Sequence, residues 1–542
     1  MKNASRILKN TAKTDDAQEA HPYTDSLEQA LSELIQTQLE PDGLLLATIN
    51  MQDRTMNVFS FDLMDALDEL MDMVECNDDV KAVILTSGKT SFLAGADLVM
   101  VRGFCTEART ASHDRMFEQC GRLGRQFVRL ENCPKPWVAA VNGLALGGGL
   151  EITLACRERI VSDEKRIQLG VPEIRWGLLP GAGGTQRLPR MVGYEKGMNL
   201  LLTGRSMTPQ EAVDSGLYRE TVPAEQLLDK ARTLARELAG APYDEAKKFA
   251  HLDQSDVPSY SEATARKVAG NFKISEEDFN LYPAFSAIVD SVLKGAGQSL
   301  AEATTTEMNE FLRLMFNPIA GRMVRTLFLG KVRAERDLAP TADIQVQSIQ
   351  TGPISPSHQQ WDTLFSKLKL PVSNSEAVPL NHLDITDTQG TTHRLQLEMI
   401  QGNTHVHRGH NAAVLCNAGP YGRLVEIVGN STQPAAKIMA ALAIKMWSLP
   451  WPSNSETSLM QSLRDLPLGK QAIKSILWAH ENDIGDVSYL DVAACLAGVS
   501  PGWTGGPLSW FWDEQDDQAS RLTGAEINAW HSIKPKLAKA CE

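Results

Sequence analysis

Two glutamates, Glu151 and Glu173, are the residues whose types and positions best suit acid–base chemistry. Glu151 ends the glycine-rich run 142–151 (NGLALGGGLE), and Glu173 follows Pro172 a short distance along the chain. Two carboxyl groups in one site can divide the acid and base roles if their surroundings push their pKa values apart. An acidic residue in the first turn of a helix is also a common surface group that stabilises the helix dipole. The spacing alone therefore leaves both interpretations open.

Two glycine-rich segments could hold an oxygen atom beside these acids. The first is 91–97 (SFLAGAD), which follows an apolar run at 80–86, and the second is 142–151, which follows the apolar run 137–141. Glycines at a strand-to-helix turn let backbone N–H groups approach a ligand, and the helix N-terminus adds partial positive charge. Glycine clusters also commonly form plain turns. Two such turns side by side could bind one oxygen.

The elements that must position these residues alternate between strands and helices. Apolar, partly β-branched runs predict strands at 44–49, 80–86, 137–141 and 167–170. Helical spacing predicts a helix that Ser60 begins, with Leu63, Leu67, Leu70 and Val74 on its apolar face, and another over 112–130. This alternation predicts an α/β fold with a parallel or mixed sheet covered by helices.

The predicted secondary structure changes after residue 230. Helices are expected at 229–238, 286–293 and 305–331, and Pro340 with the Pro-rich stretch 351–358 marks a boundary. Beyond it, strands are expected at 344–349, 377–385, 394–400, 412–416 and 424–428, with one helix at 359–368. From 433 onward helices dominate, including 525–530.

The runs 135–156, 169–193 and 201–217 resemble the enoyl-CoA hydratase/isomerase (crotonase) family, with FLAGADL at 92–98 in register. Among its members, the α subunits of multifunctional fatty-acid oxidation enzymes are the most similar. The resemblance implies a crotonase-like ββα spiral, an acyl-CoA thioester substrate and no required cofactor. It implies hydration of a trans-2-enoyl-CoA to a 3-hydroxyacyl-CoA in fatty-acid β-oxidation.

The resemblance also implies a role for each site residue. The backbone N–H groups of Ala96 and Gly148 would form the oxyanion hole for the thioester oxygen. Glu151 would activate the water added at C3, and Glu173 would exchange the proton at C2. Both acids favour hydration, because double-bond isomerisation needs chiefly the second. Asp97 and the segment 180–187 would be structural, and no residue is assigned to the CoA phosphates.

Segments 424–443 and 488–514 resemble parts of the 3-hydroxyacyl-CoA dehydrogenase that follows the hydratase in multifunctional enzymes. A dinucleotide fold needs Gly-x-Gly-x-x-Gly after its first strand, whereas this chain has 351–355 (TGPIS). Glu426 matches the acid that would pair with the catalytic histidine, but no histidine lies in a suitable register. We therefore expect a reduced Rossmann-like segment without NAD binding.

Five regions follow from these patterns. Residues 1–25 are expected to form a disordered tail, although Lys2, Arg6, Lys9 and Lys13 faintly resemble a transit peptide. The others are the crotonase-like hydratase core at 26–230, the helical extension and connector at 231–340, the degenerate dinucleotide-fold remnant at 341–431, and the helical dehydrogenase C-terminal-like domain at 432–542.

Composition limits the partners and the compartment. The net charge of −14 disfavours nucleic acid, and no apolar run approaches the roughly eighteen residues of a membrane span. The eight cysteines include no CxxC pair, which fits a reducing cytoplasm. His405, His407 and His410 alternate as metal ligands could, but no acid or cysteine follows at a ligand spacing, so we expect no metal.

Two alternatives to hydration stay open. The chain could act as an enoyl-CoA isomerase, or as a non-catalytic scaffold of a fatty-acid oxidation complex. We expect a homo-oligomer or a thiolase-containing complex.

Overall fold

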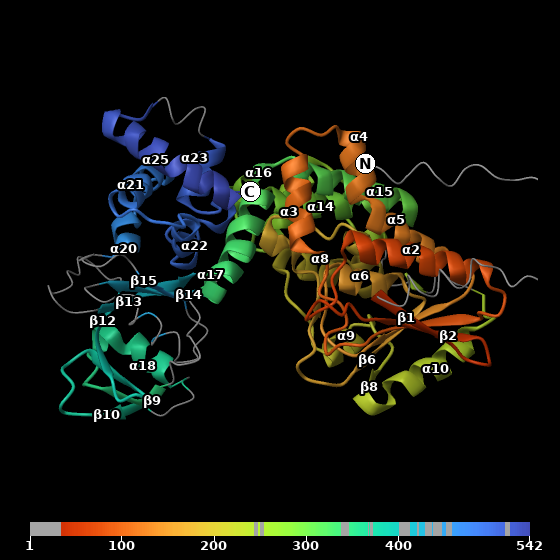
Figure 1. Cartoon of the computed structure of the whole chain (residues 1–542). Coiled ribbons are helices and arrows are strands. Elements are labelled where there is room, and N and C mark those ends of the chain that lie inside the picture. Colours follow the sequence, from red (N-terminus) through yellow and green to blue (C-terminus); the bar gives the residue numbers. More distant parts are fainter. Residues whose placement is uncertain are drawn as a thin grey trace, which may run out of the picture.

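A computed structural model gives the structure of the 542-residue chain. It describes residues 34–242, 248–249, 254–337, 346–366, 368, 372–399, 412–419, 422–428, 436, 439, 447–450, 458–514 and 521–541. The predicted tail at 1–25 and the three histidines at 405–410 lie outside the described residues. The described residues form two bodies that α16 and α17 join (Figure 1).

The N-terminal body is built on a six-stranded sheet of order β1-β2-β3-β4-β6-β8. β1 pairs antiparallel with β2, and every other neighbouring pair is parallel. The sheet is therefore mixed, as the strand–helix alternation predicted. Its strands are β1 (Ile35–Leu39), β2 (Leu44–Ile49), β3 (Ala82–Ser87), β4 (Trp137–Val141), β6 (Glu158–Ser162) and β8 (Thr221–Val222).

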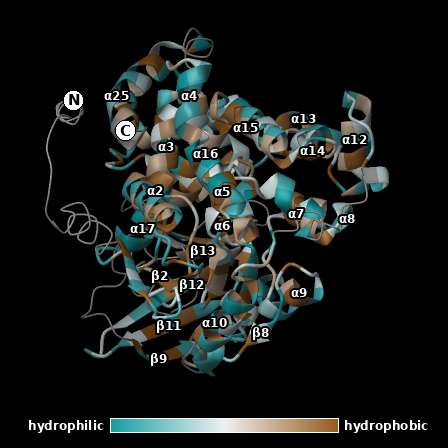
Figure 2. Cartoon of the chain, turned by 90° about the vertical axis from the view of Figure 1, so that its right-hand side faces the viewer, coloured by the Kyte–Doolittle hydropathy of each residue, from teal (hydrophilic) through white to brown (hydrophobic). Residues whose placement is uncertain are grey.

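Both faces of this sheet are covered. Alternate side chains of β2, β3 and β4 pack on one side against α10 (Leu227–Leu238), and the others face the large core of the body. Successive side chains of a strand point to opposite faces, so apolar residues at every position indicate burial on both sides. α2 (Phe61–Cys76) lies in the outer layer, and Ser60 caps its N-terminus as predicted. In Figure 2 such outer helices carry both hydrophobic (brown) and hydrophilic (teal) residues, as expected for helices that pack one face against the core and expose the other.

A second row of short strand pairings positions the site. β5 (Ala145–Leu146) pairs parallel with β7 (Leu169–Gly170). Single bridges extend the row, joining Phe59 to Ala96, Leu93 to Ala145 and Leu169 to Met207. The row thus brings the two glycine-rich turns and the segment before Glu173 to one edge.

Most predicted helices form, with shifted or broken ends. The predicted helix 112–130 is two helices, α4 (His113–Cys120) and α5 (Arg122–Asn132), which meet at Gly121. The predicted helix 305–331 begins earlier and breaks after Met315, because Asn317 caps a new helix that starts at Pro318. Its parts are α15 (Leu300–Met315), α16 (Pro318–Met323), the π-helix η4 (Val324–Gly330) and α17 (Lys331–Asp337). α14 (Pro283–Gly295) precedes them.

The second body contains a seven-stranded sheet of order β10-β9-β11-β12-β13-β14-β15. β9, α18 and β10 form a parallel βαβ unit, which is the Rossmann-like part, and two antiparallel hairpins extend it. The elements are β9 (Val346–Thr351), α18 (Gln359–Phe365), β10 (Val372–Asn374), β11 (His382–Asp387), β12 (Thr392–Met399), β13 (Ala412–Gly419), β14 (Gly422–Val428) and β15 (Trp447–Pro450). β15 is a strand in a region predicted to be mainly helical, and residues 377–381 precede β11 without being part of it.

The second sheet is also buried on both faces. In β13, Ala412, Val414 and Cys416 face the C-terminal helices, whereas Ala413 and Leu415 face α18 and its neighbours. The C-terminal helices are α20 (Leu459–Leu463), α21 (Leu468–Glu481), α22 (Ser488–Leu496), α23 (Pro507–Asp513) and α25 (Gly524–Cys541). Among the described residues, no helix is both long and apolar enough to span a membrane.

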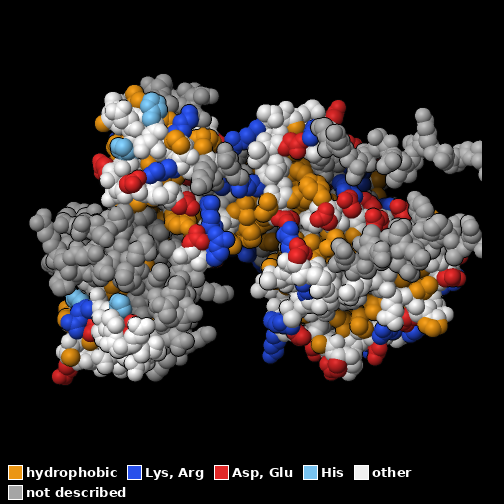
Figure 3. All heavy atoms as spheres, in the orientation of Figure 1, with side chains coloured by type: hydrophobic (Ala, Val, Ile, Leu, Met, Phe, Trp, Pro, Cys, Tyr) orange, Lys and Arg blue, Asp and Glu red, His pale blue; other side chains and the backbone are white. Residues whose placement is uncertain are grey.

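The two bodies are in direct contact through α16 and η4. Met323 and Leu327 form a small apolar cluster with Cys495 of α22, and the hydroxyl group of Thr326 donates to the carbonyl of Gly505 at 2.8 Å. Figure 3 shows Lys and Arg side chains on both sides of this junction.

Candidate functional site

Glu151 lies in the first turn of α6 (Gly148–Ala155), a helix in which every residue is buried. Its Oε1 atom accepts hydrogen bonds from the backbone N–H groups of Ala182 and Gly184, each at 2.8 Å. Burial raises its pKa to about 7, against the two N–H groups and the positive charge of Arg187. Glu151 can therefore gain and lose a proton near neutral pH, unlike a surface acid at a helix start.

Glu173 lies in the short 3₁₀ helix η1 (Pro172–Trp176), directly after β7. Its Oε2 atom is buried and has no hydrogen-bond partner. Burial raises its pKa well above the usual value of 4.5, and repulsion from Glu151 and Glu307 raises it further. Only its own backbone N–H opposes these effects, so Glu173 holds a proton more readily than Glu151 does.

Gly147 leaves room for the carboxyl group of Glu173. Its backbone has φ of +53°, and a Cβ atom built on it would lie 2.5 Å from the Oε1 atom of Glu173. Only glycine combines this backbone conformation with so close an approach. The glycine cluster thus makes room for a carboxylate as well as forming a turn.

The backbone N–H group of Ala96 faces away from its strand partner. The N–H of Phe59 donates to the carbonyl of Gly95 at 2.8 Å, and the N–H of Asp97 donates to the carbonyl of Phe59 at 2.9 Å. Because successive residues of a strand present their N–H groups to opposite sides, that of Ala96 points to the other side. Asp97 caps the next helix, α3 (Leu98–Glu107), and accepts from Arg54 at 2.8 Å, which is the turn-fixing role expected.

Gly148 is the first residue of α6, so its N–H group has no partner within the helix. The turns that carry Gly148 and Ala96 lie together, since the N–H of Leu146 donates to the carbonyl of Leu93 at 3.1 Å. This arrangement offers two backbone donors to one oxygen atom beside two buried carboxyl groups.

A third buried carboxylate, Glu307 of α15, was missed by sequence reasoning. Its oxygens accept from the N–H groups of Gly183 at 2.5 Å and Thr185 at 2.8 Å, and from the Thr185 hydroxyl at 2.5 Å. Burial and the negative charge of Glu151 raise its pKa to about 8. The turn 182–185 therefore donates alternately to Glu151 and Glu307, so this segment contacts a site acid directly and is more than the structural floor expected for it.

A buried ion-pair network stabilises the same turn. Arg187 is fully buried, donates to the carbonyl of Ala182 at 2.9 Å and pairs with Glu131 at 2.9 Å. Lys248 pairs with the other oxygen of Glu131. Burial lowers the pKa of Lys248 to about 8, whereas the two cations hold the pKa of Glu131 below its usual range despite burial.

The turn after β9 is closely packed beside Gly352. A Cβ atom at Gly352 would lie 2.0 Å from the carbonyl oxygen of Pro379, so the chain itself occupies the space beside this glycine. Asn381 then closes the turn, because its side-chain oxygen accepts from the N–H of Ser355 at 2.8 Å.

Glu426 is fully buried in β14 at the N-terminus of α20. It accepts hydrogen bonds from the hydroxyl of Ser458, the N-cap residue of α20, and from the N–H of Met460 at 3.2 Å. The acid that resembles a dehydrogenase residue thus caps a helix. Among the residues the structure describes, no group of three or more His, Cys, Asp or Glu side chains could hold a metal ion.

Comparison with known proteins gives one family match and many relatives. Residues 44–278 match the family model described as enoyl-CoA hydratase/isomerase. The fatty acid oxidation complex subunit alpha of Shewanella frigidimarina (strain NCIMB 400) is 33% identical over 309 residues, which cover 55% of this chain and 41% of that protein. The subunit of the same name from Idiomarina loihiensis is 34% identical over 314 residues, with 55% and 41% covered. The match thus spans less than half the length of these relatives.

Solved structures align with about half of the chain. An enoyl-CoA hydratase from Bacillus halodurans aligns with 54% of this chain and 98% of its own at 22% identity and a TM-score of 0.39.

Proposed function

We propose that the chain adds water across the double bond of a trans-2-enoyl-CoA, because residues 44–278 match the family model described as enoyl-CoA hydratase/isomerase. One observation carries the proposal: two buried glutamates, Glu151 and Glu173, have unequal surroundings beside two unpaired backbone N–H groups. Glu151 has two N–H donors that stabilise its charge, and Glu173 has an unpaired oxygen that disfavours charge. One acid and one base are therefore present together near neutral pH.

Each group has a step in this reaction. The thioester oxygen binds to the N–H groups of Ala96 and Gly148, which stabilise the negative charge that develops on it. Ionised Glu151 takes a proton from water as the water oxygen bonds to C3. Protonated Glu173 gives its proton to C2, so a 3-hydroxyacyl-CoA forms. A proton then returns from Glu151 to Glu173 to restore the starting state.

The names of the relatives suggest the setting of this reaction. Both curated relatives are called subunits of a fatty acid oxidation complex. We extend this name to a proposed role in fatty-acid oxidation, with acyl-CoA thioesters as substrates and a larger complex as the assembly.

We also propose that the second body does not bind NAD. Pyrophosphate binding at a βα turn needs glycines whose backbone a ligand can approach. Here the backbone at Pro379 fills the space beside Gly352, and Asn381 bonds to the turn. Calorimetric titration of the full chain with NAD should give no binding, and saturable binding would refute this part.

The hydration is tested with E151Q and E173Q variants of the full chain. Loss of the conjugated enoyl thioester absorbance should fall at least a hundredfold in each variant, since general acid–base groups commonly contribute about 10²–10⁴ in rate. The matched control is E118Q, which removes an exposed carboxylate that pairs with Arg125. No hydration by the wild type, or full rates in both variants, would refute the proposal.

A 3-enoyl-CoA distinguishes hydration from isomerisation. If E151Q loses hydration but still moves the double bond, Glu173 alone supports an isomerase activity. If both activities disappear with Glu151, hydration is the primary reaction.

A further inference from the structure

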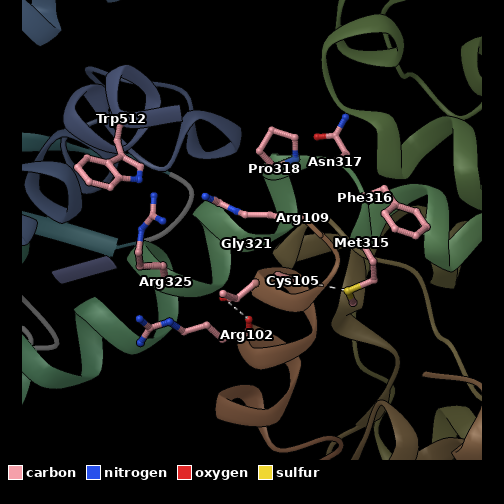
Figure 4. A pocket seen from close by; sticks show the side chains of 11 residues that line it. Arg102, Cys105, Arg109, Met315, Phe316, Asn317, Pro318, Gly321, Arg325 and Trp512 are labelled. Atoms are coloured by element: carbon pink, nitrogen blue, oxygen red, sulfur yellow. Dashed lines mark hydrogen bonds between the residues drawn. The ribbon is translucent and has the colours of Figure 1, made fainter. Parts of the chain in front are cut away.

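A pocket of about 150 Å³ lies at the junction of the two bodies. α3 contributes Arg102 and Arg109, η4 contributes Arg325, and α23 contributes Trp512. Figure 4 shows Arg109 and Arg325 extending toward Trp512 from different elements. Neither body forms this pocket alone, and α16, η4 and α23 lie beyond the residues that match the family model.

Arg325 is the most unusual residue of this pocket. Its side chain is 9% exposed, and its Nη2 atom is buried with no hydrogen-bond partner. A guanidinium group keeps its charge at any ordinary pH and carries five N–H donors. A buried charge without a partner is costly, so buried charges in proteins are paired or bind an ion. The Nη2 atom of Arg325 is thus available to an anion, while the charge of the same group also acts on Asp491, and Arg325 lies in a π-helical segment of the kind that often marks a functional site.

The neighbouring acids already have other partners. Asp513 pairs with Arg322 at 2.6 Å and with Arg109 at 3.0 Å, and Glu514 pairs with Arg322 at 3.2 Å. Asp491 accepts hydrogen bonds from the start of α23, and burial raises its pKa to about 7. Arg102, Arg109 and Arg325 therefore line the pocket, and the acids beside it, Asp513 and Glu514, are bonded to Arg109 and Arg322.

The remaining lining residues fit a phosphate-bearing ligand. Burial raises the pKa of the Cys105 thiol to about 12, so this residue adds no negative charge. The amide of Asn317 can donate to a phosphate oxygen, and the indole of Trp512 can stack on a flat ring. Arginine clusters bind phosphate through charge-assisted and bidentate hydrogen bonds. We propose that this pocket binds a phosphate group, with Arg325 as its central ligand.

Two sources could supply this group, and the first depends on the proposed function. α3 begins at Leu98, two residues after Ala96, so Arg102 lies about 6 Å along the helix from its first residue at 1.5 Å per residue. A CoA thioester held at Ala96 could therefore extend its phosphates along α3 to the pocket. The second source is a separate ligand, such as a nucleotide or free phosphate, that binds without the thioester.

Calorimetry of the full chain with inorganic phosphate, ADP and CoA tests the proposal without requiring turnover. The variant R325M should weaken the binding of a phosphate-bearing probe roughly tenfold to a hundredfold, because hydrogen bonds to charged groups are lost. R109M changes a half-exposed side chain and should weaken it in the same direction. The control R115M removes an exposed arginine that pairs with Glu107 outside the pocket, and it should leave affinity unchanged.

The outcomes separate the two sources. If R325M weakens CoA binding, the pocket holds a phosphate of the thioester substrate. If it weakens phosphate or ADP binding but not CoA binding, the pocket serves a separate ligand. If no probe binds the wild type, or both R325M and R109M bind every probe as the wild type does, the proposal is wrong. Absence of hydration by the wild type refutes the proposed function and leaves this test intact.

Discussion

The pH dependence of the proposed hydration follows from the pKa of Glu151. Glu151 must be ionised to take a proton from water, and burial raises its pKa to about 7. The ionised fraction, and with it kcat/KM, should fall about tenfold for each pH unit below 7. At pH 6 the rate should be about a tenth of its maximum, and at pH 5 about a hundredth. A glutamate with the ordinary pKa of 4.5 would keep nearly the full rate at pH 6.

The high-pH side of the profile depends on Glu173. This residue must be protonated to donate a proton to C2, and its pKa is raised well above 4.5. The rate should therefore fall again once pH exceeds the higher apparent pKa of the pair. The profile is bell-shaped, with its acid midpoint near 7.

Initial rates of enoyl-CoA hydration between pH 5 and 9 measure this profile. The residual activity of E151Q should lack the acid limb, whereas E118Q should keep it. An acid limb with its midpoint near 4.5 in the wild type would refute the reasoning, because a buried Glu151 could not then be the base.

Three further perturbations test the surroundings of the pair. G147A should lower kcat roughly a hundredfold by displacing Glu173, since misplacement of a reacting group by about 1 Å costs that much. The control G240A also changes a glycine at positive φ, but a Cβ atom there would meet no atom within 4 Å, so this variant should keep the rate. Equal effects of the two substitutions would contradict the steric argument. Glu307 binds its proton more tightly in the folded protein, where its pKa is about 8, than in the unfolded chain, where it is 4.5. The melting temperature should therefore fall as the pH rises from 5 to 8. E307Q should flatten this fall, and an unchanged slope in E307Q would contradict the assignment to Glu307. R187M should lower the unfolding free energy in urea by about 3–5 kcal/mol because it removes one partner of a buried ion pair and leaves Glu131 with Lys248 alone. A loss below about 1 kcal/mol would contradict this.

The sequence predicted the parts of the site that depend on local pattern. The strands at 44–49 and 137–141 form with the predicted bounds, because continuous apolar runs between turns suit a sheet covered on both faces. The resemblance selected Glu151, Glu173, Ala96 and Gly148, and the structure places them on adjacent turns of one row of strand pairings. Their catalytic roles stay a prediction.

Contacts between distant segments could not be predicted in the same way. Glu307 lies more than a hundred residues from the turn that it bonds, on a helix that looked like a plain connector. Its apolar stripe predicted the helix, but no local pattern shows which tertiary partner a buried acid has. A signal that could have indicated burial of Glu307 is its place near Ala303 and Met308, two buried residues of the same helix.

The break after Met315 shows a second limit. A helical stripe continues through 305–331, yet Pro318 cannot donate a backbone hydrogen bond and Asn317 offers a ready cap, so the helix restarts. The break lets η4 meet the second body, and that contact places Arg325 beside Trp512. The residues of the proposed phosphate pocket were therefore beyond prediction until the packing of the two bodies was known.

Glu426 matches the acid that would pair with a histidine in the resembled dehydrogenase, and no histidine of this chain lies in a suitable register. A buried carboxylate without a partner is strongly destabilising. In this chain Ser458 and the N–H of Met460 take the place of that partner, and the start of α20 favours negative charge. The thiol of Cys416 also donates to this carboxylate at 3.5 Å, and burial together with the carboxylate holds the pKa of the thiol well above 9. The carboxylate joins β14 to α20, so its contacts contribute to the stability of the second body.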